Sequence, residues 1–439
     1  MRPISRHPRS AGFTLIELLV VVVMVVILMI GLLEVFERNT RLATTQTQVA
    51  DMQQSLRTSQ NLMSRLTRMA GRGGLPGMIA DGALRRLPAL SVRDNVGLDG
   101  GSLQVAIGLA DGPLAVAGTD ILTVRGVFNS SIYQVDAAGG AVTLFDAGGV
   151  PTADSSQATS GTIVVSSVSP TGGPQPLEDL SATVSLGLGE ALVLVSSVDE
   201  SIYGVVELDP TNSSVSSTAI TIAFRVTGGA YTGDYRELYA SGNGVNPALP
   251  ENLSAIAWLG VLEEYRFYVR DADPNPVLSM ARMLPGTETP HGGDASAELD
   301  IAENVQQLQV ALGFHSSLGA AQTDQNGDGR TDEDDLVLTE TGDGNNDDWL
   351  FNGDGDNPAV TPWVPPWDDD PATVGIPEQP ELHYVRLTTV ARVRSPAFDY
   401  TADVIPVLEN AEVDALNEEE QLRYRRQLLQ TIIDLRNIS

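Results

Sequence analysis

One stretch of the chain carries oxygen-bearing side chains at the spacing that a hard cation requires. Residues 324–335 form a twelve-residue segment with oxygen donors at positions 1, 3, 5, 9 and 12 and a glycine at position 6. The donors are the side chains of Asp324, Asn326, Asp328, Asp332 and Asp335, with the backbone carbonyl of Arg330 at position 7. Ca²⁺ takes about six to eight oxygen ligands, and the glycine allows the sharp turn that gathers them. The segment therefore predicts a calcium site.

The surroundings of this segment bear on the same prediction. Asp335 replaces the Glu usual at position 12 of an EF-hand, a variation that resembles dockerin-type calcium loops and that we expect to weaken bidentate closure. Residues 324–370 hold fifteen acidic residues and one basic residue. So many carboxylates repel one another and favour disorder unless cations neutralise them. Three of the four tryptophans also lie there, which is unlike a disordered tail. The alternative is a solvated acidic turn. Alternate oxygen spacing within 343–356 suggests a second calcium site.

The other residue suited to chemistry is Glu17, a lone carboxylate at the head of an apolar run. Residues 13–33 would span about 30 Å as a helix, enough to cross the hydrocarbon core of a bilayer. A carboxylate there costs a few kcal/mol unless it finds a partner. Arg2, Arg6 and Arg9 precede the run with no acid among them, which places the N-terminus in the cytoplasm and the rest of the chain outside it.

Two simpler interpretations of the apolar run explain fewer of its residues. A cleaved secretory signal has a shorter apolar core that ends at small residues, whereas here Glu17 interrupts the run and Glu34-Val35-Phe36-Glu37 follows it. A plain membrane anchor explains the apolar run but not Glu17.

The segment Gly12-Phe13-Thr14-Leu15-Ile16-Glu17 resembles the processing site of type IV prepilins. The resemblance implies that a prepilin peptidase removes residues 1–12, cutting between Gly12 and Phe13, and methylates the new amine of Phe13. In lipid, the carboxylate of Glu17 could then neutralise the terminal amine of a neighbouring subunit, so that assembly relieves two buried charges at once.

A long helix must position the residues of the processing site, Phe13 to Glu17. No Gly or Pro occurs from Leu32 to Ala70, and apolar side chains recur about every 3.5 residues, with Thr45 and Ser59 breaking the seam. The apolar positions are Leu42, Val49, Met52, Leu56, Met63, Leu66 and Ala70. Glycines and a proline at 71–77 end the helix. The resemblance implies that one side of this helix packs on the chain's own globular domain.

The rest of the chain predicts a β-rich body. Short runs of Val, Ile, Thr and Tyr between turn residues indicate strands at 120–125, 161–165, 218–224 and 262–270. Near the C-terminus we expect strands at 385–393 and 430–435, paired and closing the sheet, with a helical stretch at 413–424 between them. One continuous amphipathic helix over 418–435 remains the alternative.

Composition excludes several classes of protein. The 439 residues allow two or three domains, and an apolar content of 42% allows a real core. The net charge of −31, which falls to −34 without the three Arg of the leader, excludes nucleic-acid binding by the bulk surface. There is no cysteine, hence no disulfide or thiol nucleophile. The four histidines, His7, His291, His315 and His383, show no catalytic or zinc spacing, and we expect no enzyme.

Five segments occur in the order expected of PilW-like minor pilins, the subgroup that the chain resembles most. They are 69–72, 120–125, 265–270, 303–310 and 435–437. The resemblance implies an α+β, pilin-like fold with a long N-terminal helix packed on an antiparallel β-sheet domain. We expect a leader (1–12), the helix (13–70, transmembrane over 13–33), a β-rich globular domain (71–315), an acidic calcium-binding insertion (316–380) and C-terminal strands with a short helix (381–439).

These expectations define a function. The chain is expected to be a minor pilin of the inner membrane that takes part in priming or capping a type IV pilus (fimbrium), with its globular domain in the periplasm and later on the pilus. Its expected partners are membrane lipid, prepilin peptidase, other minor pilins, the major pilin and the inner-membrane assembly platform. The alternatives are a type II secretion minor pseudopilin or a calcium-dependent tip adhesin that binds a surface ligand in cell adhesion.

Overall fold

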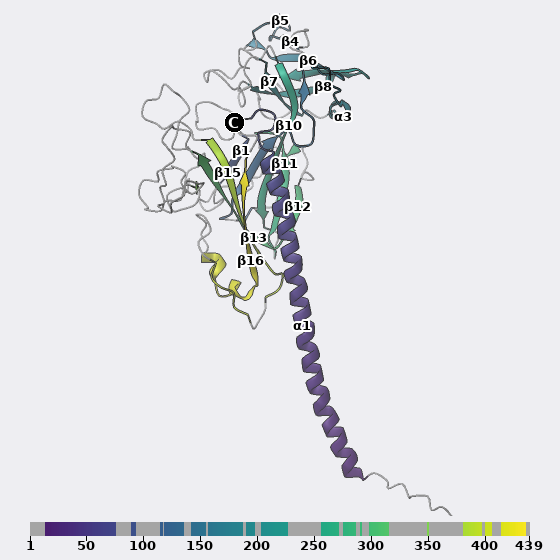
Figure 1. Ribbon diagram of the computed structural model, residues 1–439, viewed down its shortest axis with the longest axis vertical. Helices are drawn as coiled ribbons and strands as arrows, with labels where there is room; N and C mark the ends of the chain where they lie inside the picture. Colours follow the sequence, from purple (N-terminus) through teal and green to yellow (C-terminus); the bar gives the residue numbers. More distant parts are fainter. Residues whose placement is uncertain are drawn as a thin grey trace, which may run out of the picture. The chain divides into compact units, whose positions relative to one another are not determined.

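The structure is a computed structural model, drawn in Figure 1. It describes residues 14–75, 89–93, 115–116, 118–135, 142–154, 157–187, 190–197, 203–226, 256–271, 275–286, 290–291, 298–315, 349–350, 381–396, 400–405 and 414–435. The chain divides into two compact units, residues 1–53 and 54–439. The first unit is helical over its described residues, and the second holds the end of that helix and all described strands.

Helix α1 runs from Leu15 to Arg68 without interruption. Its N-terminal part is long and apolar enough to cross a membrane, and the apolar side chains of that part are exposed. In the second unit, one face of α1 is buried through residues three and four apart, the spacing of an amphipathic helix. The buried residues of this face are Leu56, Ser59, Gln60, Met63, Leu66 and Thr67.

Two details of α1 differ from the sequence expectation. Ser59 does not break the buried seam, because its hydroxyl donates to the Leu56 carbonyl at 2.9 Å and so needs no water. The helix ends at Arg68 and not at Ala70, since the next amides, of Met69 and Ala70, bond back three residues instead of four. Gly71 then leaves the helical path at a φ of 74°.

Among the described residues, the larger sheet has twelve strands. Nine of them lie in the order β1-β2-β10-β7-β8-β9-β6-β4-β5, while β11 and β3 pair with β10, and β12 pairs with β11. All of its pairings are antiparallel. The strands are β1 (Leu90–Arg93), β2 (Ile121–Gly126), β3 (Tyr133–Gln134), β4 (Val142–Phe145), β5 (Pro151–Thr152), β6 (Ser160–Ser166), β7 (Ala191–Ser196), β8 (Tyr203–Val215), β9 (Ala219–Arg225), β10 (Ile256–Arg270), β11 (Val277–Met283) and β12 (Glu298–Glu303). The four strands expected at 120–125, 161–165, 218–224 and 262–270 are confirmed as β2, β6, β9 and β10.

Strand β10 joins two parts of this sheet. Residues 256–262 pair with β7, whereas residues 263–267 pair with β2 and residues 264–270 with β11. The partner on one edge therefore changes at Glu263, halfway along the strand.

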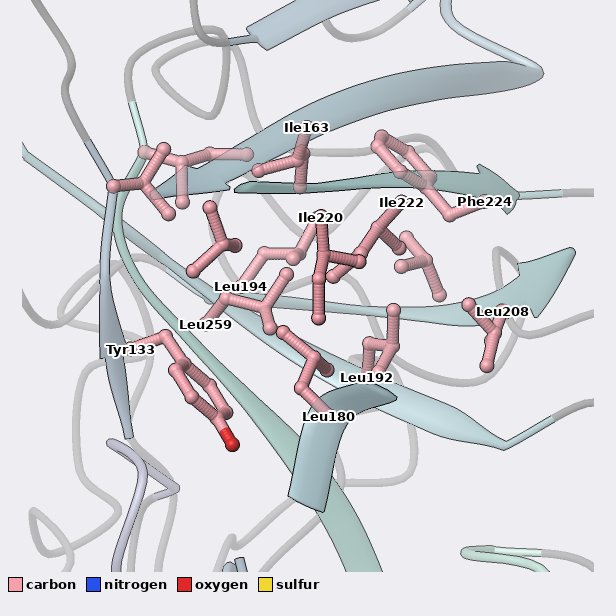
Figure 2. Packing of buried hydrophobic residues seen from close by; sticks show 14 of the residues in the cluster. Tyr133, Ile163, Leu180, Leu192, Leu194, Leu208, Ile220, Ile222, Phe224 and Leu259 are labelled. Carbon is pink, nitrogen blue, oxygen red and sulfur yellow. The ribbon is translucent and has the colours of Figure 1, made fainter. Parts of the chain in front are cut away.

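One hydrophobic core of the described residues is formed by side chains of β6, β7, β8, β9 and the first half of β10. Figure 2 shows Leu192, Leu194, Ile220 and Phe224 converging there, with Leu180 from helix α3 (Glu178–Leu186) packed against them. These side chains come from alternate positions of their strands, as expected of a sheet with one buried face.

In the part of the chain that the structure describes, a second sheet has four strands in the order β14-β13-β15-β16. Its strands are β13 (Val305–His315), β14 (Trp349–Leu350), β15 (Glu381–Arg392) and β16 (Arg426–Asp434), all antiparallel. The expected pairing of the two C-terminal strands is confirmed, but they join β13 and do not close the larger sheet. In the described part of the connection between them, the structure has two 3₁₀ turns, η6 (Asp414–Asn417) and η7 (Gln421–Arg423). Because residues 426–434 form β16, the continuous helix over 418–435 is wrong.

Gln60 ties the buried face of α1 to this second sheet. Its Nε2 donates to the Leu429 carbonyl at 2.8 Å and to the Thr389 hydroxyl at 3.0 Å. A long N-terminal helix followed by antiparallel sheet confirms the expected α+β fold class.

Candidate processing and assembly site

The first turn of α1 is closed by three reciprocal hydrogen bonds between Thr14 and Glu17. The Thr14 backbone N–H and hydroxyl each donate to Glu17 Oε2 at 3.0 Å, and the Glu17 N–H donates to the Thr14 hydroxyl at 3.3 Å. This is a capping box, in which Thr14 is the N-cap residue and Glu17 the third residue of the helix. It satisfies backbone donors that the start of a helix leaves without partners.

The capping box fixes where the Glu17 carboxylate lies. Bonded to the backbone N–H of Thr14, it sits at the first turn, where the helix dipole favours negative charge. Gly12 and Phe13, the predicted processing residues, lie outside the described residues. Thr14 directly follows Phe13 in the sequence, so the carboxylate stands one residue from the position that the prepilin resemblance makes the new N-terminus.

Past the apolar run, the helix surface becomes polar. Arg38 pairs with Glu34 at 2.6 Å and Arg41 with Glu37 at 2.5 Å, both one turn apart and exposed. Exposed pairs of this kind stabilise a helix only slightly. They mark the end of the segment that lipid can accommodate, because no charged residue other than Glu17 occurs between Thr14 and Leu33.

The predicted calcium ligands, Asp324 to Asp335, lie outside the described residues, as does most of 343–356. The structure instead defines the strands on either side of them. His315 of β13 and Glu381 of β15 are register partners, so residues 316–380 connect the adjacent ends of two paired strands. Within that connection, Trp349 and Leu350 pair with Gly313 and Leu312. Across the described ranges, no group of three or more acids or histidines could hold a metal.

Four of the five segments taken as PilW-like markers contact one another, which sequence reasoning did not predict. At the end of α1, the Gly71 N–H donates to the Arg125 carbonyl at 3.0 Å, and Val127 N–H donates to the Arg72 carbonyl at 2.8 Å. At the start of β2, Asp120 Oδ2 accepts from the Val310 N–H at 2.7 Å. Strand β2 is thus the common neighbour of these markers.

The segment 265–270 lies in strand β10, which contacts β2 through a buried ion cluster around Glu264. Glu264 is fully buried; Arg125 Nε lies 2.6 Å from its Oε2, and Arg266 Nε lies 2.7 Å from its Oε1. The Gly286 N–H also donates to Oε2 at 2.6 Å. Burial alone would raise the pKa of Glu264, but Arg125 and Arg266 hold that pKa below its usual value. The carboxylate is therefore ionised in the folded protein.

A second cluster of polar groups surrounds Glu263, the residue before Glu264 in β10. Arg282 lies 3.3 Å from Glu263 and 3.4 Å from Glu190, and His291 Nε2 lies 2.6 Å from Glu190. The Tyr265 hydroxyl donates to Glu263 at 3.1 Å, and burial together with that carboxylate raises the pKa of Tyr265 to about 12. Because every charge faces an opposite one, we interpret the cluster as structural.

Comparison with known proteins supports the N-terminal assignment. Residues 7–33 match the prokaryotic N-terminal methylation motif. A solved type IV-like pilin from Thermus thermophilus matches with 11% identity and a TM-score of 0.15, covering 60% of this chain and 100% of the other. A likeness with so low a TM-score carries no structural argument. No curated protein sequence matches the chain. The N-terminal segment is prepilin-like and fits a membrane-anchored pilin.

Proposed function

We propose that this prepilin-like chain is a minor pilin that takes part in priming or capping a type IV pilus. The observation that carries the proposal is the Thr14–Glu17 capping box at the head of a membrane-length apolar helix, within residues that match the methylation motif. Gly12 and Phe13 are the cleavage site for prepilin peptidase, and Glu17 is the assembly residue. The protein has no catalytic activity of its own.

The energetics of assembly follow from Glu17. In lipid, both a lone carboxylate and a lone terminal amine are costly, and each finds its partner only when two apolar helices pack side by side. The capping box holds the carboxylate at the helix terminus before assembly, so little side-chain entropy is lost when the amine arrives. Other minor pilins, the major pilin and the inner-membrane assembly platform are the proposed partners.

The orientation follows from charge. The basic leader stays in the cytoplasm, α1 crosses the inner membrane once, and the β-rich unit lies in the periplasm and then on the pilus. A type II secretion minor pseudopilin shares every one of these features and is the alternative within the same architecture.

The insertion between β13 and β15 favours a second function, that of a calcium-dependent tip adhesin. Its 65 residues hold the predicted calcium ligands, and they leave the sheet and return to it at the register partners His315 and Glu381. We propose that calcium orders this insertion and that its tryptophans contact a surface ligand.

Processing can be tested directly. We predict that the chain, expressed with a prepilin peptidase, loses residues 1–12 and carries a methylated Phe13, and that Gly12→Val abolishes the cut because a side chain then occupies the cleavage position. Mass spectrometry of the N-terminal peptide measures both changes.

The matched control is Gly31→Val, in the same apolar helix, where an added Cβ would meet nothing within 4 Å. It should be processed like the wild type. An uncut wild-type chain would refute the prepilin assignment and with it the pilus function.

A further inference from the structure

A hollow of about 410 Å³ opens on the polar face of strands β4, β6, β8 and β9. It lies in the second unit and has no part in the processing site. Its volume falls in the range of about 300–1,000 Å³ typical of small-molecule sites. The polar side chains lining it are Thr159, Ser160, Thr162, Asp209, Asn212 and Arg225, and Phe145 adds an aromatic ring.

Strand alternation places these side chains on the face opposite the core. Ser160 is the register partner of Arg225 and Thr162 that of Ala223, with Gly161 and Phe224 paired between them. Phe224 points into the core, as Figure 2 shows, so its neighbours in the strand point away from it. The polar side chains of β6 and β9 that line the hollow therefore come from the outward face of the sheet, while Gly161 and the core residue Phe224 also border the hollow.

An irregularity in β8 gives the hollow one of its walls. Asp209 pairs with Ala223 and Ser214 pairs with Thr221, so four residues of β8 face a single residue of β9. Such a bulge re-aims side chains and bends the strand. Here it carries Asn212, whose Nδ2 donates to Asp209 Oδ2 at 2.9 Å.

The charges of the hollow cancel. Arg225 NH2 lies 2.8 Å from Asp209 Oδ2, and Arg225 Nε donates to the same oxygen at 3.0 Å. Burial would raise the pKa of Asp209, but the hydrogen bonds from Asn212 and Arg225 hold that pKa below its usual value. The pair is thus ionised and neutral overall, while the Arg225 side chain remains 35% exposed.

This chemistry selects one class of ligand. With its one cation neutralised, in a chain of net charge −31, the hollow offers little attraction to an anion. It offers hydroxyls that donate and accept, a guanidinium and an amide with N–H groups, and an aromatic ring whose electron-rich face suits C–H groups. We propose that the hollow binds a neutral saccharide unit, with its hydroxyls on the polar side chains and its C–H face near Phe145.

Saturation-transfer NMR on the full chain tests this proposal, in a detergent that has no sugar headgroup. The probes are the methyl glycosides of glucose, galactose and mannose, N-acetylglucosamine, and the anionic N-acetylneuraminate for comparison. We expect transfer to at least one neutral sugar at about 10 mM. Thr162→Val and Phe145→Leu should each weaken that binding about five-fold or more, the size of one hydrogen bond or contact.

Thr221→Val is the matched control, because Thr221 lies half-buried on the same face of β9 but outside the lining of the hollow. It should bind like the wild type. The proposal is overturned if no neutral sugar binds, if N-acetylneuraminate binds at least as tightly as the best of them, or if the three variants behave alike. The measurement uses the isolated protein, so its result does not depend on the pilus function.

Discussion

At the scale of single residues, two carboxylates of this chain need partners for opposite reasons. Glu264 already has its partners within the fold, since Arg125 and Arg266 contact both of its oxygens. Glu17 has only the first turn of its own helix within the described residues, and we propose that its charged partner comes from another subunit. The first carboxylate stabilises the fold, and the second serves assembly.

We predict that Glu264→Gln lowers the free energy of unfolding by about 3–5 kcal/mol, because it leaves two guanidinium groups buried without their counter-charge. Thermal unfolding of the full chain, followed by circular dichroism, measures the loss. Glu419→Gln is the matched control, since Glu419 is 94% exposed and lies 3.9 Å from Arg423. It should unfold like the wild type. Equal effects of the two substitutions would contradict the structural role of the cluster.

The lowered pKa of Glu264 also predicts how the stability of the protein depends on pH. The folded pKa of Glu264 lies below its ordinary value of 4.5, so its contribution is fully present above that value. It is lost as the pH falls through the folded pKa, when the buried carboxylate takes up a proton. The melting temperature of the wild type should therefore fall steeply below about pH 4.5, and that of Glu264→Gln should fall less. Parallel curves for the two proteins would show that Glu264 does not contribute.

At the scale of elements, β10 and β2 organise the second unit. Strand β10 pairs with β7 and β3 up to Leu262 and with β2 and β11 from Glu263 onward, and the ion clusters lie at this change of partners. Strand β2 receives the end of α1 through Arg125, and Asp120, the residue just before β2, accepts from Val310 of β13. We therefore interpret the segments 69–72, 120–125, 265–270 and 303–310 as contacts that hold the end of the helix and the two sheets together.

Strand β6 offers a test of how tightly the sheet packs. A Cβ added at Gly161 would lie 2.4 Å from Phe224 Cζ, in the core of Figure 2. We predict that Gly161→Ala destabilises the chain by about 1–3 kcal/mol through overpacking. Gly173→Ala, where the nearest atom is Ser169 Oγ at 3.5 Å, is the control and should change stability little. Chemical denaturation measures both; an unchanged Gly161→Ala would mean that Phe224 moves aside freely.

At the scale of the whole molecule, the insertion and the membrane helix are separate additions to one β-rich body. Residues 316–380 are flanked by the register partners His315 and Glu381, and Trp349 and Leu350 within them pair with β13, so the second sheet anchors the insertion. The helix enters at the other end of the chain and finishes against the second sheet through Gln60. Assembly and surface binding can therefore be carried by different parts of the chain.

We predict that calcium protects residues 316–380 from limited proteolysis, relative to the same protein in a chelator. Cation binding neutralises the acidic segment and orders it. Asp324→Ala combined with Asp328→Ala should abolish this protection. Asp368→Ala combined with Asp369→Ala, which removes the same charge outside the predicted loop, should preserve it. A digestion pattern that is the same with and without calcium would indicate that the segment is a solvated acidic loop.

Local sequence patterns were sufficient for several features. The apolar run with Glu17 predicted a membrane-length helix, and short runs of Val, Ile, Thr and Tyr between turn residues predicted β2, β6, β9 and β10. Both signals depend on residues close together in the chain, which is why one sequence suffices. Ser59 was misjudged because its hydroxyl is satisfied by its own helix, a bond that hydropathy does not register.

Only the tertiary structure decided which segments distant in the chain pair with one another. The sequence by itself determined the leader motif, the long helix, several of the strands and the acidic ligand spacing. It did not determine that β15 and β16 join β13 in a second sheet, that Glu264 lies between Arg125 and Arg266, or that the outward residues of four strands form a hollow. Hydropathy periods report which face of an element is buried, whereas partners distant in the chain are chosen by the packing of all elements together.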